Sequence, residues 1–251
     1  MTALPEETTV VHTRLLRITL AVNESQAYWE HDAPDAEPHA LVSLAFDARW
    51  FGGKSAARVA RVLQDMSARY AAFPESLDVL RHWSAMSAAT RRLVCHWHLQ
   101  LSDPLYRRFS GLFLPERRSR GASADLTRDL VARWARAEGG DRWAPVTCVQ
   151  FASKLLSSAF EAGLVASRRD PRPLATPLVP DDALAYLLYL LRGVRFAGTL
   201  VDNPYLASVG LTGLLLEARL GRLEDVTYRR MGDVVEVEWK APSLKAWGAA
   251  L

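Results

Sequence analysis

Hydrophobic positions recur at the spacing of an α-helix over most of the chain. In residues 54–72, Val59, Val62, Leu63 and Met66 fall on one side of a helical wheel, and charged residues occupy the other side. Because an α-helix repeats every 3.6 residues, such a stripe is typical of a helix that packs against a core. The pattern therefore predicts a chain that is mainly α-helical.

Several helix starts are marked by a proline. The pairs Asp103-Pro104 and Asn203-Pro204 place a capping side chain directly before the proline, and Pro74 opens a third apolar segment. Proline suits the first helical turn because no helical hydrogen bond needs an N–H there. Helices or apolar elements are expected over residues 13–29, 39–51, 54–72, 74–84, 87–101, 104–113, 125–137, 147–162 and 204–221.

Patterns typical of β-strands occur only in the C-terminal half of the chain. Residues 234–240 carry apolar side chains at every second position and, with residues 226–230, flank a short turn. This arrangement predicts a β-hairpin. A second pair of segments, residues 164–167 and 174–179, flanks an arginine-rich turn and predicts a two-stranded ribbon.

The length of 251 residues suits one large domain or two modest ones, at about 150 residues per domain. The charged, small-residue segment 117–123 is the best candidate for a boundary. We expect an N-terminal helical bundle over residues 1–122 and a helix-turn-helix unit with its ribbon over residues 123–180. A C-terminal helix with a β-hairpin is expected over residues 181–251.

Residues 125–179 hold the most informative arrangement of the sequence. A first helix, a glycine turn, a second helix with an apolar inner face and an arginine-tipped ribbon follow one another. This is the order of a winged helix-turn-helix, in which the second helix enters the major groove of DNA and the ribbon meets phosphate. The residues of this unit expected to contact DNA are Thr147, Gln150, Ser153, Lys154, Ser157, Arg168, Arg169 and Arg172.

Charge is distributed unevenly along the chain. Residues 1–50 carry 3 basic and 8 acidic residues, whereas residues 51–122 carry 12 basic and 5 acidic ones. All but four of the 31 cations are Arg, which can contact phosphate through two parallel hydrogen bonds. The basic middle is therefore either a second face for nucleic acid or a solvated surface that balances the acidic segment. Its candidate DNA contacts are Lys54, Ser55, Arg58 and Arg61.

Two short motifs suggest a nucleotide or a metal, and both are incomplete. Residues 53–55 read Gly-Lys-Ser, like the end of a phosphate loop, but position 48 holds Ala where that loop needs glycine. Cys95, His96 and His98 are metal-binding residue types, but a helix places at most two of them on one side, and a structural zinc site needs four ligands. We expect a helix cap and core histidines, with no cofactor and no metal.

An enzymatic alternative lies in the predicted C-terminal hairpin. Asp225, Glu238 and Lys240 imitate the Asp…Glu-x-Lys arrangement of metal-dependent nucleases, in which the acids hold Mg²⁺ and the lysine steadies the attacking water. Strand alternation places Glu236 on the same face as Glu238. A solvated strand face explains the same residues, so the nuclease remains an alternative.

The sequence predicts neither a membrane segment nor a disulfide framework. The longest uninterrupted apolar run, residues 183–191, is closed by Arg192, whereas a spanning helix needs about 20 apolar residues. Residues 1–9 are acidic and polar rather than a basic and apolar leader. With two cysteines only, a reducing cytoplasm is expected.

Residues 50–165 carry a resemblance to a known family. It rests on residues 54–58 leading to Arg69, on residues 91–108, and on a third set at wider spacing. The third set consists of Trp143, Thr147, Lys154, Leu155, Glu161, Ala162, Gly163 and Leu164. In these positions the chain resembles the BrxA family, small proteins of the BREX phage-defence systems of bacteria.

The resemblance implies a helical, DNA-binding protein with a bundle similar to the NusB fold and a winged-helix portion. It also implies partners among the other BREX proteins. The extension over about residues 180–251 departs from the family.

Taken together, these observations favour a non-enzymatic, cytoplasmic protein that binds double-stranded DNA within a phage-defence complex. A protein–protein adaptor is the first alternative, because the eight Trp residues and the apolar C-terminal helices suit an interface. The metal-dependent nuclease is the second alternative.

Overall fold

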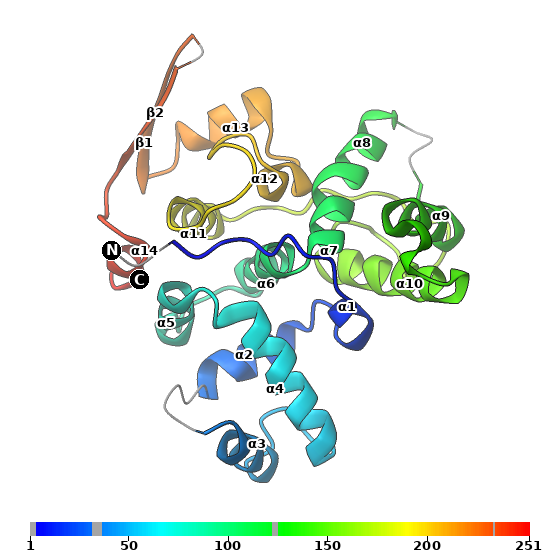
Figure 1. The fold of residues 1–251 in the computed structure, drawn as a ribbon. Helices are drawn as coiled ribbons and strands as arrows, with labels where there is room; N and C mark the ends of the chain where they lie inside the picture. The colour runs from blue at the N-terminus through cyan, green and yellow to red at the C-terminus, as the bar shows by residue number, and fades with distance from the viewer. Residues whose placement is uncertain (1–3, 32–36, 122–124, 233) are drawn as a thin grey trace.

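The computed structural model describes residues 4–31, 37–121, 125–232 and 234–251 (Figure 1). It is mainly helical and has one two-stranded hairpin near its C-terminal end, as the sequence predicts. The helices are α1 (Arg14–Arg17), α2 (Val22–His31), α3 (Pro38–Asp47), α4 (Ala56–Tyr70), α5 (Pro74–His82), α6 (Ala88–Ser102), α7 (Pro104–Arg108), α8 (Leu114–Ser119), α9 (Arg128–Gly139), α10 (Pro145–Glu161), α11 (Asp181–Arg192), α12 (Pro204–Ser208), α13 (Gly213–Leu220) and α14 (Leu244–Gly248). A π-helical turn, η1 (Phe109–Phe113), joins α7 to α8, and a 3-10 turn, η3 (Gly140–Arg142), follows α9. The hairpin strands are β1 (Val226–Met231) and β2 (Val234–Trp239).

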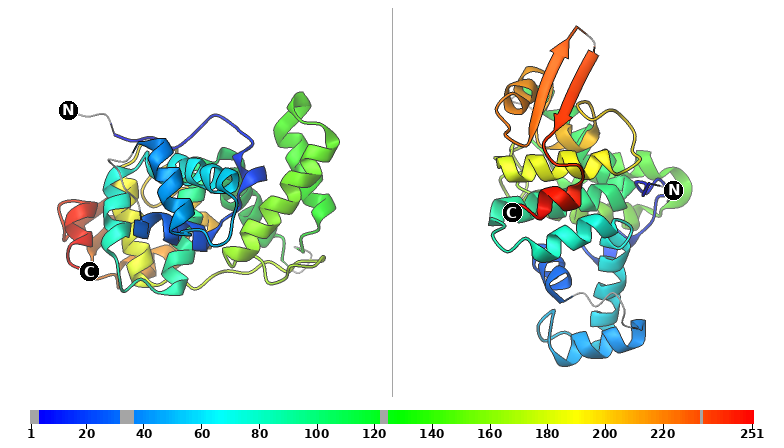
Figure 2. Two further views of the ribbon diagram at one scale, coloured as in Figure 1. Left: turned by 90° about the horizontal axis from the view of Figure 1, so that it is seen from below. Right: turned by 90° about the vertical axis from the view of Figure 1, so that its left-hand side faces the viewer.

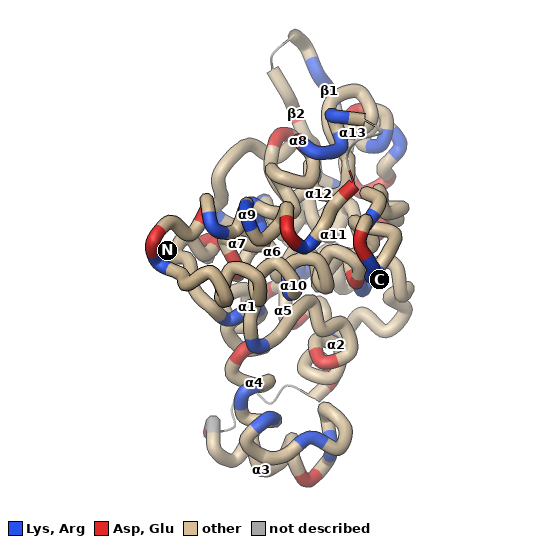
Figure 3. The backbone as a smooth tube through the Cα atoms, turned by 90° about the vertical axis from the view of Figure 1, so that its right-hand side faces the viewer, with Lys and Arg blue, Asp and Glu red and all other residues tan. Residues whose placement is uncertain are grey.

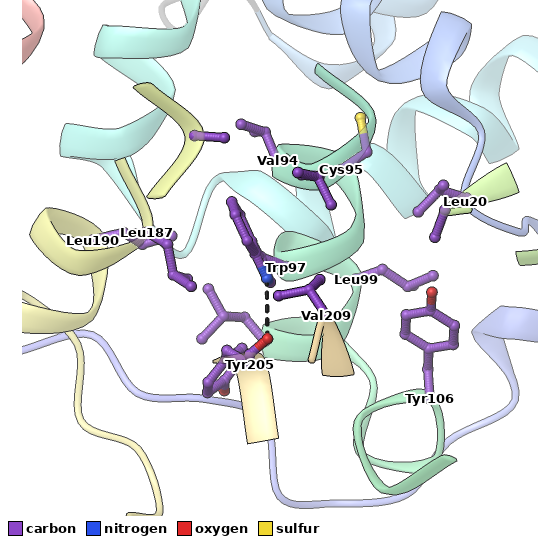
Figure 4. Close-up of a cluster of buried hydrophobic side chains, with 14 of the residues drawn as sticks. Leu20, Val94, Cys95, Trp97, Leu99, Tyr106, Leu187, Leu190, Tyr205 and Val209 are labelled. Atoms are coloured by element: carbon purple, nitrogen blue, oxygen red, sulfur yellow. Dashed lines mark hydrogen bonds between the residues drawn. The ribbon is translucent and has the colours of Figure 1, made fainter. Parts of the chain in front are cut away.

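Helix α6 lies at the centre of the molecule, where it packs against α2, α4, α7 and α11 (Figure 1). All of its residues from 93 to 102 are buried. Trp97 lies in the middle of this stretch, and its indole Nε1 donates a hydrogen bond to the carbonyl oxygen of Tyr205 at 3.2 Å (Figure 4). The buried stretch also contains His96, His98, Gln100 and Ser102, and each of these side chains is hydrogen-bonded within the core, as burial of a polar group requires.

A single cluster of buried side chains extends through all parts of the fold, from Met66 through Ala152 to Leu187. Helix α11 packs against α6, α12 against η1 and α7, and α14 against α5. Residues 122–124, where the first domain boundary is expected, lie outside the described residues. The division into three domains therefore stays a prediction, and the C-terminal segment contributes to the burial of α6.

The expected helix starts are confirmed by their caps. The side chains of Ser55, Asp103 and Asn203 each accept a hydrogen bond from the backbone N–H three residues further on, at 3.4, 2.9 and 3.0 Å. Each cap satisfies one of the N–H groups that the first helical turn leaves without a helical partner. Residues 53–55 therefore lead into a helix cap, as predicted.

The prediction of a single helix over residues 13–29 is wrong. The chain forms α1 and α2, with residues 18–21 between them as an unwound segment. Arg69, on α4, donates hydrogen bonds to two carbonyls of this segment at 2.6 and 2.8 Å. Glu161, on α10, accepts a hydrogen bond from one of its N–H groups at 3.2 Å. Because distant side chains satisfy these backbone groups, the segment has no need of helical hydrogen bonds.

The helix expected over residues 204–221 is interrupted as well, by a turn at Gly210. This glycine has a φ of +78°, and a Cβ there would lie 2.8 Å from Thr176 Cγ2. The helix expected over residues 104–113 instead continues through η1 to the end of α8. The segment 117–123 therefore begins as helix.

An extended N-terminal strap, residues 4–12, crosses the face of α6 and reaches the C-terminal half of the chain (Figures 1 and 2). The carboxylate of its buried Glu7 accepts hydrogen bonds from Ala197 N at 3.0 Å and from the Tyr205 hydroxyl. Arg107 Nε lies 3.4 Å from the same carboxylate. Further backbone hydrogen bonds join the strap to α6 and to the loop after α11. A buried carboxylate requires such partners, so the strap is firmly attached.

Strands β1 and β2 pair antiparallel, from Val226 opposite Trp239 to Met231 opposite Val234. The hairpin predicted from the alternating pattern is therefore confirmed to within a residue at each strand. It projects from the body of the protein beside α13 (Figure 2). One face, which includes Tyr228, is half-buried, and the other is exposed.

Helix α11 contains the longest apolar run of the sequence and is buried within the protein. It has 12 residues, fewer than the roughly 20 that a bilayer requires. In the part of the chain that the structure describes, no helix combines the length and the apolar character needed to span a membrane.

The close approach of η1 and α12 leads to a prediction at Gly111. A Cβ added there would lie 2.4 Å from Pro204 Cβ and 2.7 Å from the Pro204 carbonyl oxygen. Gly111→Ala should lower the free energy of unfolding by about 2–3 kcal/mol, because backbone cannot move aside as a flexible side chain can. Gly53→Ala is the matched control, since a Cβ there meets nothing within 4 Å. Equal urea midpoints for the two variants would contradict this packing.

Candidate nucleic-acid interface

Helices α9 and α10 form a closely packed pair joined by the short turn η3 (Figure 1). Phe151 and Leu155 of α10 are fully buried, as are Val131 and Ala135 of α9. The ring of Trp143, in the connection, lies with its centroid 4.3 Å from that of Phe151. The predicted succession of helix, turn and helix is therefore present.

The ribbon after α10 is shorter than predicted. The strands expected over residues 164–167 and 174–179 reduce to one antiparallel bridge between Val165 and Leu174, with a hydrogen bond on either side. A second bridge joins Leu126, just before α9, to Arg172. The segment contains Pro at positions 171, 173 and 177, and proline has no N–H to donate, which prevents a longer pairing.

The outer face of α10 is exposed and uncharged along its first half. Val146 and Val149 are 65% and 42% exposed, and Gln150 and Ser153 are exposed beside them. These four residues form the α10 stripe. Among the other residues expected to contact DNA, Thr147, Lys154 and Ser157 are half-buried. The Ser157 hydroxyl donates to a Glu161 carboxylate oxygen at 3.3 Å.

The three arginines expected at the ribbon tip differ in their surroundings. Arg168 and Arg169 are exposed, and the guanidinium of Arg168 lies over the ring of Phe160 at 4.8 Å. Arg172 is turned inward: its side chain is 13% exposed, and its Nε lies 2.6 Å from a carboxylate oxygen of Asp170. Arg172 is thus paired within the protein, and two arginines are left at the tip.

A basic cleft of about 700 Å³ lies beside the second half of α10. The unwound segment and the start of α2 form one wall, and the first turns of α4 and α6 form others. Figure 3 shows basic positions on the neighbouring helices α1 and α4. Two carboxylates, Glu24 and Glu161, line the cleft. The cations that line it are Arg17, Arg58, Arg91, Arg92, Lys154 and Arg168.

Most of these cations lack a carboxylate partner. Arg17 is paired with Asp65 through a contact of 2.5 Å. Arg58 and Arg91 donate to backbone carbonyls at 3.2 and 3.3 Å. Within the described residues, none of the other five cations has a carboxylate oxygen within 4.0 Å. The cleft therefore presents unneutralised positive charge on several walls.

The basic residues expected on the helix over 54–72 are divided by the structure. Lys54 is paired with Glu24 at 3.2 Å, and Ser55 caps α4. Arg58 lines the cleft together with Lys154 and Arg168, so the two basic surfaces expected from the sequence meet there. Arg61 is exposed on α4 outside the lining of the cleft.

The histidines of α6 are core residues, as predicted. His96 is hydrogen-bonded to Tyr106 and Ser208, each at 2.8 Å, and His98 to the hydroxyl of Tyr186 at 2.7 Å. Burial lowers the pKa of both histidines to about 3. Among the described residues no three His, Cys, Asp or Glu side chains gather where they could hold a metal ion.

Within the described residues, Asp225, Glu236 and Glu238 do not gather where they could hold a metal ion. The Asp225 carboxylate accepts a hydrogen bond from the indole Nε1 of Trp247, on α14, at 2.7 Å. Glu236 and Glu238 lie on the exposed face of β2, opposite Arg229 and Thr227. Their arrangement is that of a solvated strand face.

Sequence reasoning missed three residues of the cleft, namely Arg17, Arg91 and Arg92. The pair Arg91-Arg92 near the start of a predicted helix was a visible signal, but its position beside α10 depends on the tertiary fold. No model of a known protein family and no curated protein matches this sequence. The resemblance to the BrxA family stays a prediction.

Proposed function

We propose that this protein binds double-stranded DNA through the α10 stripe and the cations beside it, without catalysing a reaction. The observation that carries the proposal is that α10 presents an exposed, uncharged face along its first half and lines the basic cleft with its second half. An uncharged helix face that is continued by unpaired cations suits a duplex, whose base edges lie next to rows of phosphates.

The α10 stripe has side chains that can read bases in the major groove. Gln150 can form two hydrogen bonds with adenine, and Ser153 can bond to either base of a pair. The methyl groups of Val146 and Val149 can contact the methyl group of thymine. None of these four side chains carries a negative charge that would repel phosphate.

The cations supply the part of the affinity that does not depend on sequence. Arg168 lines the cleft together with Arg58, Arg91, Arg92 and Lys154, and Arg169 is exposed next to Arg168 at the ribbon tip. Contacts to phosphate displace condensed counterions, so each one makes binding weaker as salt rises. Six candidate contacts are therefore available.

The resemblance to the BrxA family supports the same proposal. Four of its positions, Thr147, Lys154, Leu155 and Glu161, lie on α10, and another, Arg69, holds the wall of the cleft. We therefore place the protein in a bacterial phage-defence system of the BREX type, in the cytoplasm, with other proteins of that system as partners.

Salt dependence tests the proposal. The logarithm of the affinity for a blunt duplex should fall with the logarithm of salt concentration with a slope of about −5, since each contact contributes roughly 0.9. The double variant Arg168→Gln, Arg169→Gln should make the slope shallower by about 2. Fluorescence anisotropy with one labelled duplex, between 50 and 200 mM salt, measures both slopes.

Arg222→Gln with Arg229→Gln is the matched control, because these exposed arginines lie at the hairpin end of the molecule, away from α10 (Figure 1). This control should keep the slope of the unaltered protein. Absence of binding at 50 mM salt would refute the proposal, and nicking of supercoiled plasmid in the presence of Mg²⁺ would refute its non-catalytic part.

A protein–protein adaptor is the second candidate function, and the hairpin end favours it. A groove of about 770 Å³ runs between α13, β1 and β2. Close to it, Leu214 and Leu215 are 83% and 55% exposed, and Met231 is 69% exposed at the end of β1. Exposed apolar side chains in a group are typical of protein contacts. If the protein fails to bind DNA, this function takes precedence.

A further inference from the structure

We infer that the basic cleft beside α10, whose rim adjoins the duplex face, holds inside it a binding site for an unpaired nucleotide with its phosphate. The nucleotide can come from two sources. It can be the single-stranded end of a bound DNA duplex, in which case the inference rests on the proposed function, or it can be a free nucleotide, in which case the inference is independent of the proposed function. Both sources present the same chemistry, which is a single base plane and an accessible phosphate.

The size of the cleft favours a nucleotide over a duplex. Its volume of about 700 Å³ lies within the range of sites for small molecules. The unwound segment is fixed against the C-terminal end of α10 by the hydrogen bond from its backbone to Glu161. A paired duplex can touch the rim of such a cleft, but only a strand or a small molecule can enter it.

The charge of the cleft, with six cations against the carboxylates Glu24 and Glu161, favours an anion that reaches inside. Arg58, Arg91, Arg92 and Lys154 come from three different helices and have no carboxylate partner within the described residues. Helix α6 also begins here, since Ala88, its first residue, lines the cleft. The N–H groups of the first helical turn add partial positive charge. A phosphate can neutralise several of these groups at once.

The base has a surface to stack on. Arg168 lies over one face of Phe160, and both residues line the cleft. Nucleic-acid bases stack on guanidinium planes as they do on aromatic rings. A base placed on the outer side of Arg168 would extend this stack, while its phosphate lies toward the helices on the opposite wall.

The wall of the cleft is held in place before any ligand arrives. Arg69 and Glu161 satisfy three backbone groups of the unwound segment from two different helices. Ile18, in that segment, is buried and lines the cleft. A preformed site loses little conformational entropy on binding, which favours a ligand as small as one nucleotide.

Two measurements with the purified full chain test the inference. Two labelled duplexes, one with a tail of four thymidines at a 5′ end and one with the same tail at a 3′ end, are compared with the same duplex with blunt ends. One of the tailed duplexes should bind about tenfold tighter than the blunt one, in line with the stacking of a base. In the second measurement, calorimetry follows binding of deoxyadenosine monophosphate alone.

The variant Arg58→Gln with Arg92→Gln should abolish the advantage of the tail and any binding of the mononucleotide. The ratio of tailed to blunt affinity is the measure, because it cancels the general effect of charge on duplex binding. Arg222→Gln with Arg229→Gln should retain the ratio. Circular dichroism confirms that each variant keeps its fold.

The outcomes separate the two proposals. If the tail improves binding and the mononucleotide does not bind, the site takes a strand end. If the mononucleotide binds and the variant loses it while no duplex binds, the cleft inference stands without the proposed function. A blunt duplex that binds as well as both tailed ones, with no mononucleotide binding, overturns the cleft inference and leaves the proposed function intact. The cleft inference is also overturned if the variant Arg58→Gln, Arg92→Gln still binds a tailed duplex more tightly than the blunt one.

Discussion

Between pH 7 and pH 4.5, the free energy of unfolding should fall by about 5 kcal/mol through two buried histidines. Burial is the main cause that lowers the pKa of His96 and His98 from 6.5 to about 3, and the positive charges of Arg118 near His96 and of Arg69 near His98 contribute to it. Below pH 6.5 the unfolded chain binds two protons that the folded chain rejects, so stability is complete above pH 6.5 and is lost as pH falls toward 3. Two pH units correspond to roughly 2–3 kcal/mol for each group.

Urea denaturation at pH 7, 6, 5 and 4.5 measures this loss. The double variant His96→Gln, His98→Gln should lose less free energy of unfolding between pH 7 and pH 4.5 than the unaltered protein does, whatever the stability of the variant at pH 7. His82→Gln is the control, because that side chain is exposed on α5. Burial raises the pKa of Asp103, so this carboxyl stabilises the folded protein as pH falls, opposite to the effect of the two histidines. Its contribution is the same in all three proteins. The prediction would be contradicted if the unaltered protein and the double variant lost the same free energy of unfolding between pH 7 and pH 4.5.

Arg69→Met should lower the free energy of unfolding by about 3–4 kcal/mol. Arg69 is 3% exposed, and its guanidinium donates hydrogen bonds to Leu20 O at 2.6 Å and Thr19 O at 2.8 Å. Methionine fills much of the same space but donates nothing, so two carbonyls of the unwound segment lose their partners, at about 1–3 kcal/mol each. Thermal and urea unfolding measure the change.

Arg61→Met tests whether the effect belongs to the position and not to the loss of an arginine. Arg61 is exposed on the same helix, so its replacement should change stability by less than about 0.5 kcal/mol. Hydrogen exchange should also show faster opening of residues 18–21 in Arg69→Met. Equal stability of the two variants would mean that the unwound segment is held by other contacts.

The parts of the fold that the sequence predicts are those decided by neighbours along the chain. Ser55, Asp103 and Asn203 cap helices because their partners are three residues away, and the hairpin follows from the alternation in β2. Amphipathic α4 is confirmed for the same reason, since its stripe is complete within one segment.

The break between α1 and α2 depends on partners that are far away in the sequence. Arg69 is 49 and 50 residues from the carbonyls that it binds, and Glu161 is 140 residues from its N–H donor. No local pattern shows such pairings, so the periodicity of residues 13–29 leads to one helix where the fold has two. The shortened ribbon, by contrast, could have been anticipated from its prolines.

The cleft was the least predictable feature. Its cations come from α1, α4, α6, α10 and the ribbon, and each stretch taken alone is an ordinary basic surface. The sequence indicates that residues 51–122 are basic, but only the packing of α10 against the unwound segment turns separate arginines into one site.

The N-terminal strap has a consequence for the order in which the chain can reach its final form on the ribosome. Glu7 emerges early, yet Ala197 and Tyr205, which donate hydrogen bonds to its carboxylate, are made 190 and 198 residues later. Until then the Glu7 carboxylate lacks these two partners, and the part of the strap that pairs with the loop after α11 remains open to other molecules in the cell. We expect the strap to close onto residues 195–205 in a late folding step, and to be accessible to chaperones until that step.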